Sequence, residues 1–216
     1  VNGIADMTRE IFGPVLHVAT FKSTELDRVI ADINATGYGL TFGLHTRIDD
    51  RVQAVVEKIH AGNIYVNRDQ IGAVVGSQPF GGEGMSGTGP KAGGPHYLQR
   101  FTAPTPATST QRWDRMADIA DLTNRLSAPL PAASTPTDLP GPTGESNRHS
   151  VAPRGPVLCM GPGHDTTQTQ IKAVGDLGGL GISADGTVPP EALTDLPLLG
   201  GVIWWGDADT GRVIEQ

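Results

Sequence analysis

The 216-residue sequence has a single cysteine, Cys159. One cysteine permits no internal disulfide and no cysteine-rich metal site, which suits a reducing compartment, so we expect a cytoplasmic protein. The sequence also lacks an apolar run long enough to cross a bilayer, and no signal-peptide pattern follows Val1. Basic residues are few near the C-terminus, where residues 165–216 carry eight acidic and two basic residues. Such a surface repels phosphate backbones, so we expect no nucleic-acid binding by this segment.

The composition is that of a globular protein rich in turns. Hydrophobic residues make up 38% of the chain, and there are 29 glycines and 17 prolines. This length allows one large domain or two modest ones. The six histidines show neither i, i+4 pairing nor acidic spacing, so we expect no metal site. Ser86 lies among glycines but outside a Gly-x-Ser-x-Gly motif, which favours a turn residue over a nucleophile.

Strand-like and helix-like patterns alternate over the first 67 residues. We predict strands at 15–21, 41–46 and 63–67. One helix is predicted from a Thr24–Asp27 capping box to Gly37, and another from Asp49 or Asp50 to Gly62. Their apolar faces comprise Leu26, Val29, Ile30 and Ile33 in the first, and Val52, Val55, Val56 and Ile59 in the second. This alternation predicts βαβ units on a parallel sheet covered on both faces, an α/β fold.

The loop at 68–89 follows the last of these strands and is rich in glycine. Ligands of parallel sheets bind beyond the carboxyl ends of the strands, where this loop begins. Its apolar residues argue against disorder, and a loop of this length in a compact domain is usually functional. The N–H groups of Gly72 and Ala73 are placed to form a small nest for an anion. The alternative is that Gly72 and Ala73 only shape a turn.

Prolines mark the middle of the chain, with nine of the 17 between residues 102 and 156. They predict the end of the first domain and a linker. Within the linker we predict a helix whose apolar side comprises Trp113, Met116, Ala120, Thr123 and Leu126. After Gly155 we predict a strand at 157–160, a turn at 161–163, a helix at about 166–177 and a strand at 201–205. Two strands are too few for a stable open sheet, and the Gly-x-Gly of the turn is a weak partial match to a dinucleotide loop.

Two motifs resemble the C-terminal third of an aldehyde dehydrogenase. They are Glu10-Ile-Phe-Gly-Pro-Val15 and Ile71-Gly-Ala-Val-Val-Gly-Ser-Gln-Pro-Phe80-Gly-Gly. Within that superfamily, 72–76 resembles the aldehyde anchor loop of L-glutamate γ-semialdehyde dehydrogenases. The stretch from Leu139 to Arg148 is similar to a segment of the bifunctional, proline-degrading proline utilization A family. The resemblance implies NAD-dependent oxidation of a small-molecule substrate, L-glutamate γ-semialdehyde, to L-glutamate in proline degradation.

The resemblance also implies roles for five residues. The Glu10 carboxylate would accept hydrogen bonds from the nicotinamide ribose hydroxyls, and the Phe12 ring would pack beside that ribose. Gly72 and Ala73 would hold the substrate α-carboxylate through their amides, while Phe80 packs against the aliphatic stem. A carboxylate suits vicinal hydroxyls because it offers acceptors and no competing donor. The alternatives are that Glu10 is a solvated acid and Phe12 an ordinary core residue.

The catalytic residues of the family do not match positions in this chain. The nucleophilic cysteine precedes the Glu10 motif in that family, and the general base, the oxyanion-stabilising asparagine and the glycine-turn cofactor site are likewise expected upstream. Cys159 lies in an apolar strand, where its thiol pKa is raised and its sulfur hidden, so we reject it as the nucleophile. FAD would belong only to a proline dehydrogenase domain outside this chain. We therefore expect a fragment that is inactive alone.

The resemblance predicts three regions. Residues 1–101 would be the C-terminal part of the catalytic domain, 102–154 a Pro-rich linker with one amphipathic helix, and 155–216 the start of a non-catalytic, Rossmann-like C-terminal domain. The stretch 96–102 resembles the family's outlying strand, which predicts a homodimer through the strand near Tyr97–Phe101. Two alternatives remain: a fragment of a broad-substrate aldehyde dehydrogenase, and a non-catalytic module for oligomerisation or channel sealing.

Overall fold

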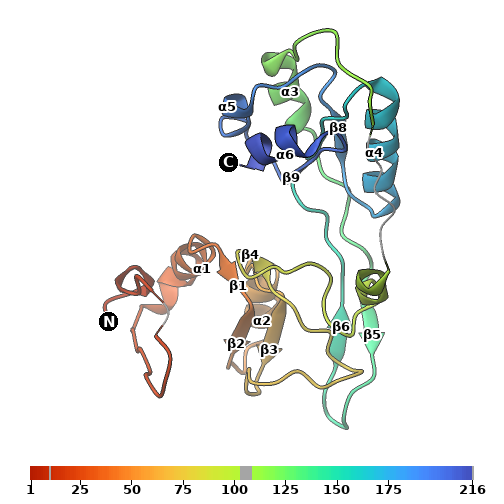
Figure 1. The fold of residues 1–216 in the computed structure, drawn as a ribbon. Coiled ribbons are helices and arrows are strands. Elements are labelled where there is room, and N and C mark those ends of the chain that lie inside the picture. The colour runs from red at the N-terminus through yellow and green to blue at the C-terminus, as the bar shows by residue number, and fades with distance from the viewer. Residues whose placement is uncertain (10, 103–108, 216) are drawn as a thin grey trace. The chain divides into compact units, whose positions relative to one another are not determined.

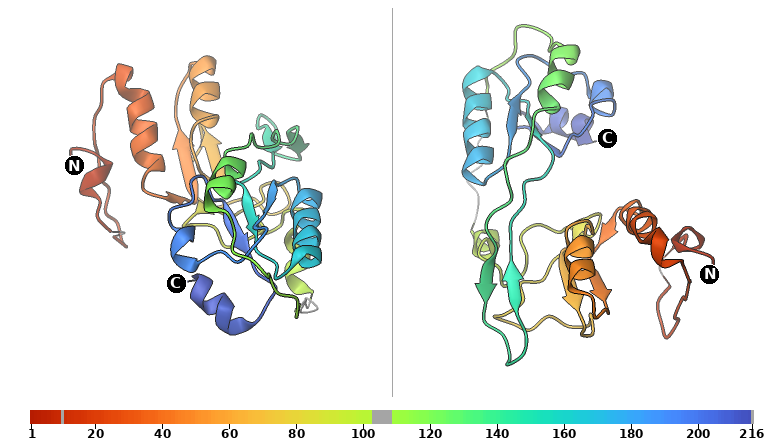
Figure 2. Two further views of the ribbon diagram at one scale, coloured as in Figure 1. Left: turned by 90° about the horizontal axis from the view of Figure 1, so that it is seen from above. Right: turned by 180° about the vertical axis from the view of Figure 1, so that it is seen from behind.

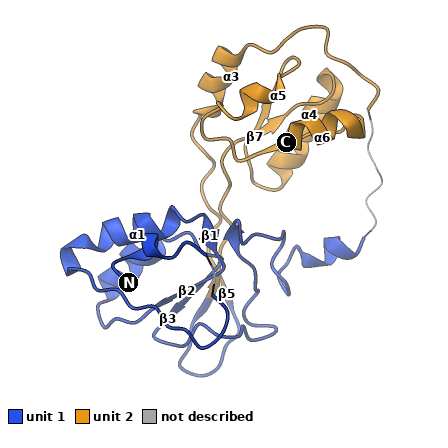
Figure 3. Cartoon of the chain, turned by 60° about the vertical axis from the view of Figure 1, so that its left-hand side comes forward, with its two compact units in different colours: residues 1–103, 139–147 blue, residues 104–138, 148–216 orange. Residues whose placement is uncertain are grey.

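The computed structural model describes residues 1–9, 11–102 and 109–215. The chain divides into two compact units (Figure 3). Unit 1 comprises residues 1–103 and 139–147, and unit 2 comprises 104–138 and 148–216. Both units are mixed α/β with a small parallel sheet, as the sequence predicts for the fold class. Within the described ranges, no helix is both long enough and apolar enough to cross a bilayer.

Unit 1 is built around two parallel strands. Strand β2 (Thr41–Leu44) pairs with β3 (Asn63–Val66), and β1 (Tyr38–Gly39) pairs antiparallel with β4 (Glu83–Gly84) (Figure 1). The helical elements are η1 (Ile4–Asp6), η2 (Ser23–Glu25), α1 (Leu26–Asn34), α2 (Asp49–Val56) and η3 (Tyr97–Phe101).

The two helices of unit 1 share one apolar core with the sheet. Ile30 of α1 and Val55 of α2 are buried together with Ile59, and Phe42 and Ile64 of the strands pack against them. Figure 2 shows both helices beside β2 and β3. The predicted βαβ order and parallel pairing at residues 41–67 are confirmed, and Val55 of the predicted helical face is buried. The helix is shorter than predicted, because α2 ends at Val56, which is exposed, and the buried Ile59 lies beyond it.

The first predicted strand of unit 1 is wrong. Residues 15–21 contain no strand, and Leu16 is 86% exposed. A strand needs a neighbour to bond its backbone, and the described residues place none beside this run. The Thr24–Asp27 capping box is also wrong, since the Glu25 carboxylate accepts from the Lys22 N–H at 3.0 Å instead.

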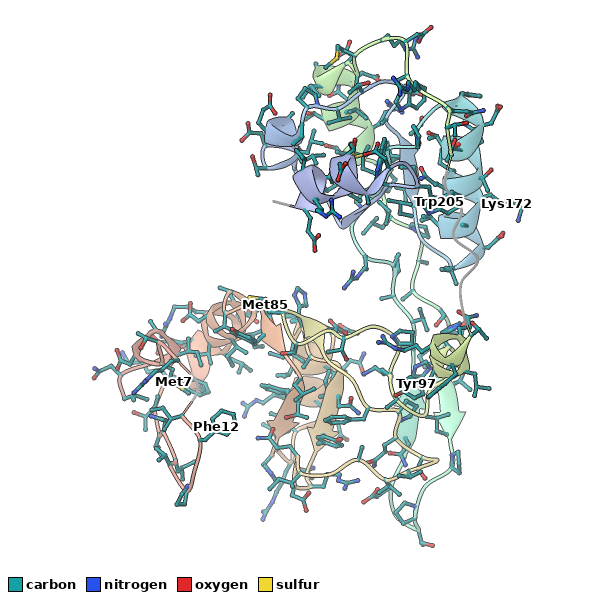
Figure 4. The ribbon with its side chains drawn as sticks, in the orientation of Figure 1. Met7, Phe12, Met85, Tyr97, Lys172 and Trp205 are labelled. Atoms are coloured by element: carbon teal, nitrogen blue, oxygen red, sulfur yellow. The ribbon has the colours of Figure 1, made fainter. Side chains whose placement is uncertain are left out.

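The expected oligomerisation strand near Tyr97–Phe101 is a second error. These residues form the 3-10 helix η3, which begins at Tyr97 (Figure 4). The Tyr97 and Phe101 rings meet edge to face with centroids 5.5 Å apart. The Tyr97 N–H bonds back to the Gly94 carbonyl, so local turn bonds replace the ladder that a strand would require. A dimer through a strand at this position has no support in the structure.

Unit 2 contains three parallel strands in the order β8-β7-β9. They are β7 (Val157–Cys159), β8 (Gly181–Ser183) and β9 (Gly201–Ile203). The helices are α3 (Ile119–Leu126), α4 (His164–Asp176), α5 (Pro190–Leu193) and α6 (Ala208–Glu215). Two further short strands, β5 (Thr137–Leu139) and β6 (Asn147–His149), form a separate two-stranded sheet.

The predictions for unit 2 held for β7, α4 and β9 but missed β8. The helix predicted from Trp113 begins later, at Ile119, where the Asp118 carboxylate caps the Ala120 and Asp121 N–H groups. Its buried face is Leu122 and Leu126, both fully enclosed beside Leu158 of β7. Of the predicted apolar side, Leu126 is buried as expected, but Ala120 is exposed and Leu122 takes its place, so that α3 packs in the core of unit 2.

Candidate functional site

The loop at 68–89, which contains the predicted anchor residues 72–76, follows the carboxyl end of β3. It is called the anchor loop below. Gly72 and Gly76 have φ angles of +75° and +84°, which L side chains rarely adopt. The N–H groups of Gly72 and Ala73 have no hydrogen-bond partner within the described ranges. Two consecutive amides without an internal partner, beside a left-handed glycine, are available as donors to an anion.

Internal bonds of the loop close a tight turn beyond these amides. The Val74 N–H donates to Gln78 Oε1 at 2.9 Å, and the Ser77 and Gln78 N–H groups bond to the Val74 carbonyl at 3.1 and 2.9 Å. The turn leaves Val75 97% exposed. The N–H groups of Val74, Ser77 and Gln78 are thus used within the loop, whereas those of Gly72 and Ala73 have no partner among the described residues.

The stretch 139–147 contacts both ends of the loop, and all these residues belong to unit 1. Arg68 NH1 lies 3.1 Å from the Glu145 carboxylate, and the Arg68 guanidinium sits 5.2 Å from the centroid of the Tyr65 ring. At the other end, Gln78 Nε2 donates to Asn147 Oδ1 at 3.1 Å. The two motifs singled out in the sequence, at 71–82 and 139–148, therefore meet in space.

Phe80 is held at the end of the loop. Its N–H donates to the Ala92 carbonyl at 3.0 Å, and its carbonyl accepts from the Ala92 N–H at 2.8 Å. The ring is half-buried. Gly72, Ala73 and Phe80 thus lie on one loop, as predicted.

Of the two predicted cofactor residues, Glu10 and Phe12, the structure describes only Phe12. Glu10 lies outside the described residues. Phe12 is 86% exposed, so its ring packs neither in the core of unit 1 nor against the loop (Figure 4). The core alternative for Phe12 is thereby wrong in this chain.

Sequence reasoning missed four polar residues that position the loop: Asn63, Arg68, Gln78 and Lys91. No periodic pattern identifies them. The sequence signal that could have identified one of them is Lys91, a single charged residue within the glycine- and proline-rich stretch 89–94. In the structure Lys91 is half-buried, and burial lowers its pKa while Glu83 opposes the shift.

Cys159 has the environment expected of an unreactive thiol. It ends β7 in unit 2, is fully buried, and its pKa is raised to about 11 by burial, with a smaller opposing effect from a backbone hydrogen bond of Ile182. The Gly161–Gly163 turn after it is engaged by the protein itself, since the buried Gln170 amide accepts from the Gly161 N–H and donates to its carbonyl, each at 2.9 Å.

We predict that Cys159 reacts with Ellman's reagent about a hundredfold more slowly in the native protein than in urea, because its pKa rises from 9.0 to about 11. The folded state then keeps a proton that the unfolded state releases. Its contribution to stability is present below about pH 9 and lost as pH rises toward 11. Equal rates in buffer and in urea, followed by absorbance, would contradict this assignment.

Comparison with known proteins gives a match to one family over part of the chain. Residues 4–105, which contain the loop 68–89, match the model of the aldehyde dehydrogenase family.

Among curated proteins, the chain is similar to the bifunctional protein PutA of Salmonella typhimurium. The two are 41% identical over 225 aligned residues, which cover 91% of this chain and 17% of that protein. It is also similar to the 1-pyrroline-5-carboxylate dehydrogenase of Bacillus cereus, with 51% identity over 92 residues, 43% of this chain and 18% of the relative. The chain therefore spans less than a fifth of the length of these relatives.

A solved structure gives a match over nearly the whole chain. Proline utilization A from Corynebacterium freiburgense aligns with a TM-score of 0.56 and 26% identity, covering 96% of this chain and 25% of that one. The likeness thus extends beyond the segment that matches the aldehyde dehydrogenase family.

Proposed function

We propose that this chain is part of an NAD-dependent L-glutamate γ-semialdehyde dehydrogenase of proline degradation, and that it supplies the substrate-carboxylate anchor and one wall of the nicotinamide pocket. The observation that carries the proposal is the pair of unpaired amides at Gly72 and Ala73, on a loop that also holds Phe80 in place. The printed name of the Bacillus cereus relative, 1-pyrroline-5-carboxylate dehydrogenase, supports the choice of substrate.

The chemistry of the anchor follows from its donors. Backbone N–H groups that point at a carboxylate form charge-assisted hydrogen bonds, which are stronger than bonds between neutral groups. With the α-carboxylate bound at Gly72 and Ala73, the aliphatic stem would lie along Phe80 and the aldehyde beyond it. These residues bind and orient the substrate, and an upstream cysteine would form the thioester that water releases.

NAD would accept the hydride in this reaction. Phe12 fits a place beside the nicotinamide ribose, because its exposed ring is free to pack against an added group. The assignment of Glu10 to the ribose hydroxyls rests on the Glu-Ile-Phe-Gly-Pro motif alone. FAD would be bound only by a proline dehydrogenase domain elsewhere in the parent protein.

The wider organisation remains part of the proposal. It comprises a catalytic region at 1–101, a Pro-rich linker at 102–154 whose helix α3 packs in unit 2, a non-catalytic Rossmann-like segment at 155–216, a homodimer and a cytoplasmic location. The parallel order β8-β7-β9 supports the Rossmann-like interpretation of the last segment. The second candidate, a non-catalytic module, is favoured by the fully buried Cys159, because the described residues offer no accessible thiol.

The proposal is tested in a chimera in which this chain replaces the matching segment of the Salmonella protein. We expect the chimera to reduce NAD with glutamate semialdehyde. Within it, Glu10→Gln should weaken NAD use about tenfold to a hundredfold, since a hydrogen bond to a charged group contributes about 1.5–3 kcal/mol. Initial rates at varied NAD measure this effect.

The matched control is Glu57→Gln, which removes an exposed carboxylate at the end of α2. It should leave the kinetics of the chimera unchanged. An unaltered KM and kcat for NAD in Glu10→Gln would remove Glu10 from the cofactor wall.

A further inference from the structure

One side chain fixes both neighbours of Phe80 along the chain. Asn63, the first residue of β3, is 9% exposed. Its Nδ2 donates to the Pro79 carbonyl at 3.0 Å, and its Oδ1 accepts from the Gly81 N–H at 3.2 Å. The side-chain amide of Asn63 therefore forms hydrogen bonds on both sides of Phe80. These bonds restrict the backbone conformation that sets the direction of the Phe80 ring.

Lys91 completes this cross-link. Its Nζ donates to the Gly81 carbonyl at 2.8 Å, to Asn63 Oδ1 at 3.1 Å and to the Gly62 carbonyl. An ammonium group has three N–H donors, and these three uncharged acceptors use all of them. Lys91 therefore joins the end of the anchor loop to the start of β3 rather than carrying a solvated surface charge.

The backbone from the Pro79 carbonyl to the Gly81 carbonyl is bonded at every polar group, because Ala92 pairs with Phe80 in both directions. Close packing accompanies these bonds, since a Cβ at Gly62 would overlap the Gly81 carbonyl. The end of the loop is thus fixed, while the amides at residues 72–73 remain open.

We propose that Asn63 and Lys91 are positioning residues of the aldehyde-anchor loop, which hold Phe80 where it contacts the aliphatic stem of the substrate. The inference rests on the function proposed above. It assigns recognition of the aliphatic stem to Phe80, at the cross-linked end of the loop. Recognition of the carboxylate is assigned to the amides of Gly72 and Ala73, which have no partner within the loop. Loss of the cross-link should therefore affect recognition of the stem first.

The cross-link is tested in the 216-residue protein by amide hydrogen exchange measured by NMR. In Lys91→Met, the Phe80, Gly81 and Ala92 amides should exchange about tenfold to a hundredfold faster, the effect of losing hydrogen bonds from a charged donor. The matched control is Lys172→Met, which removes an exposed lysine of α4 in unit 2 (Figure 4). It should leave these three amides unchanged.

A chemical rescue separates the amine from general damage to the fold. Lys91→Cys should show the same fast exchange, and aminoethylation of its thiol restores an amine at nearly the native length. The buried Cys159 is protected from the reagent. Slow exchange restored by aminoethylation supports the cross-link even if Lys91→Met fails to fold. Native exchange rates in Lys91→Met, or no recovery after aminoethylation, would overturn it.

The role in positioning is tested in the chimera with two aldehydes. In Lys91→Met we expect KM for glutamate semialdehyde to rise about tenfold, with kcat and the KM for NAD little changed. The constants for acetaldehyde, which has no stem to contact Phe80, should stay near those of the unsubstituted chimera. Equal losses for both aldehydes would show general structural damage and contradict a positioning role.

Phe80→Ala distinguishes failure of this inference from failure of the proposed function. If Phe80→Ala leaves the kinetics of glutamate semialdehyde unchanged, the substrate site is elsewhere and the proposed function loses its basis. If Phe80→Ala raises KM and Lys91→Met does not, the site stands and the positioning role of Lys91 is refuted.

Discussion

The purified 216-residue chain is expected to reduce no NAD with glutamate semialdehyde above the uncatalysed rate. Oxidation through a thioester needs a thiolate at the aldehyde. The only cysteine, Cys159, is fully buried in unit 2, and its pKa is raised to about 11. Enzymes accelerate reactions by about a millionfold or more, so NADH fluorescence will distinguish activity from its absence clearly.

The chimera with the Salmonella protein is the positive control for this assay. It receives the upstream residues that the family resemblance requires and should turn over under the same conditions. Turnover by the isolated chain that disappears in Cys159→Ser would refute both the inactivity of the chain and the rejection of Cys159 as nucleophile.

The sequence predicted the elements whose patterns are local and long. The apolar spacing of α2 and the β-branched run of β3 predict the parallel pair and the start of its helix correctly, because burial of Val55 and Ile64 against each other's elements stabilises them, although α2 ends at Val56 and not at Gly62. The run at 15–21 has an equally apolar pattern, but the part of the chain that the structure describes gives it no neighbour to pair with. Strand β8 was missed because Gly181-Ile-Ser183 offers one apolar residue, and its place depends on pairing with β7.

The residues of the candidate site likewise fall into two groups: those that a local sequence pattern predicts, and those whose role depends on contacts between distant segments. The glycine-rich composition predicted a loop at 68–89, and Gly72 and Gly76 adopt positive φ angles there because glycine has no Cβ to oppose them. The roles of Asn63 and Lys91 depend on segments 28 residues apart that meet only in the folded chain. Contacts of this kind leave no periodic trace, so the supports of the loop could not be predicted even where the loop could.

The second large effect on activity is expected from a substitution at residues 72–73, whose amides are proposed to bind the substrate carboxylate. In the chimera, Ala73→Pro removes one of the two unpaired donors, and proline also restricts the conformation of Gly72 before it. We expect kcat/KM for glutamate semialdehyde to fall about tenfold to a hundredfold, because only this substrate loses a charge-assisted hydrogen bond. An uncharged aldehyde of similar length should lose far less.

The matched control is Ala73→Gly, which keeps the backbone N–H and removes only a methyl group. If the amide is the anchor, this variant keeps the preference for glutamate semialdehyde that Ala73→Pro loses, because recognition depends on the donor and not on the side chain. Equal losses for charged and uncharged aldehydes in Ala73→Pro would mean that the turn is only a scaffold. The broad-substrate aldehyde dehydrogenase would then be the better assignment, since the preference for a substrate with an α-carboxylate would have no demonstrated basis in this loop.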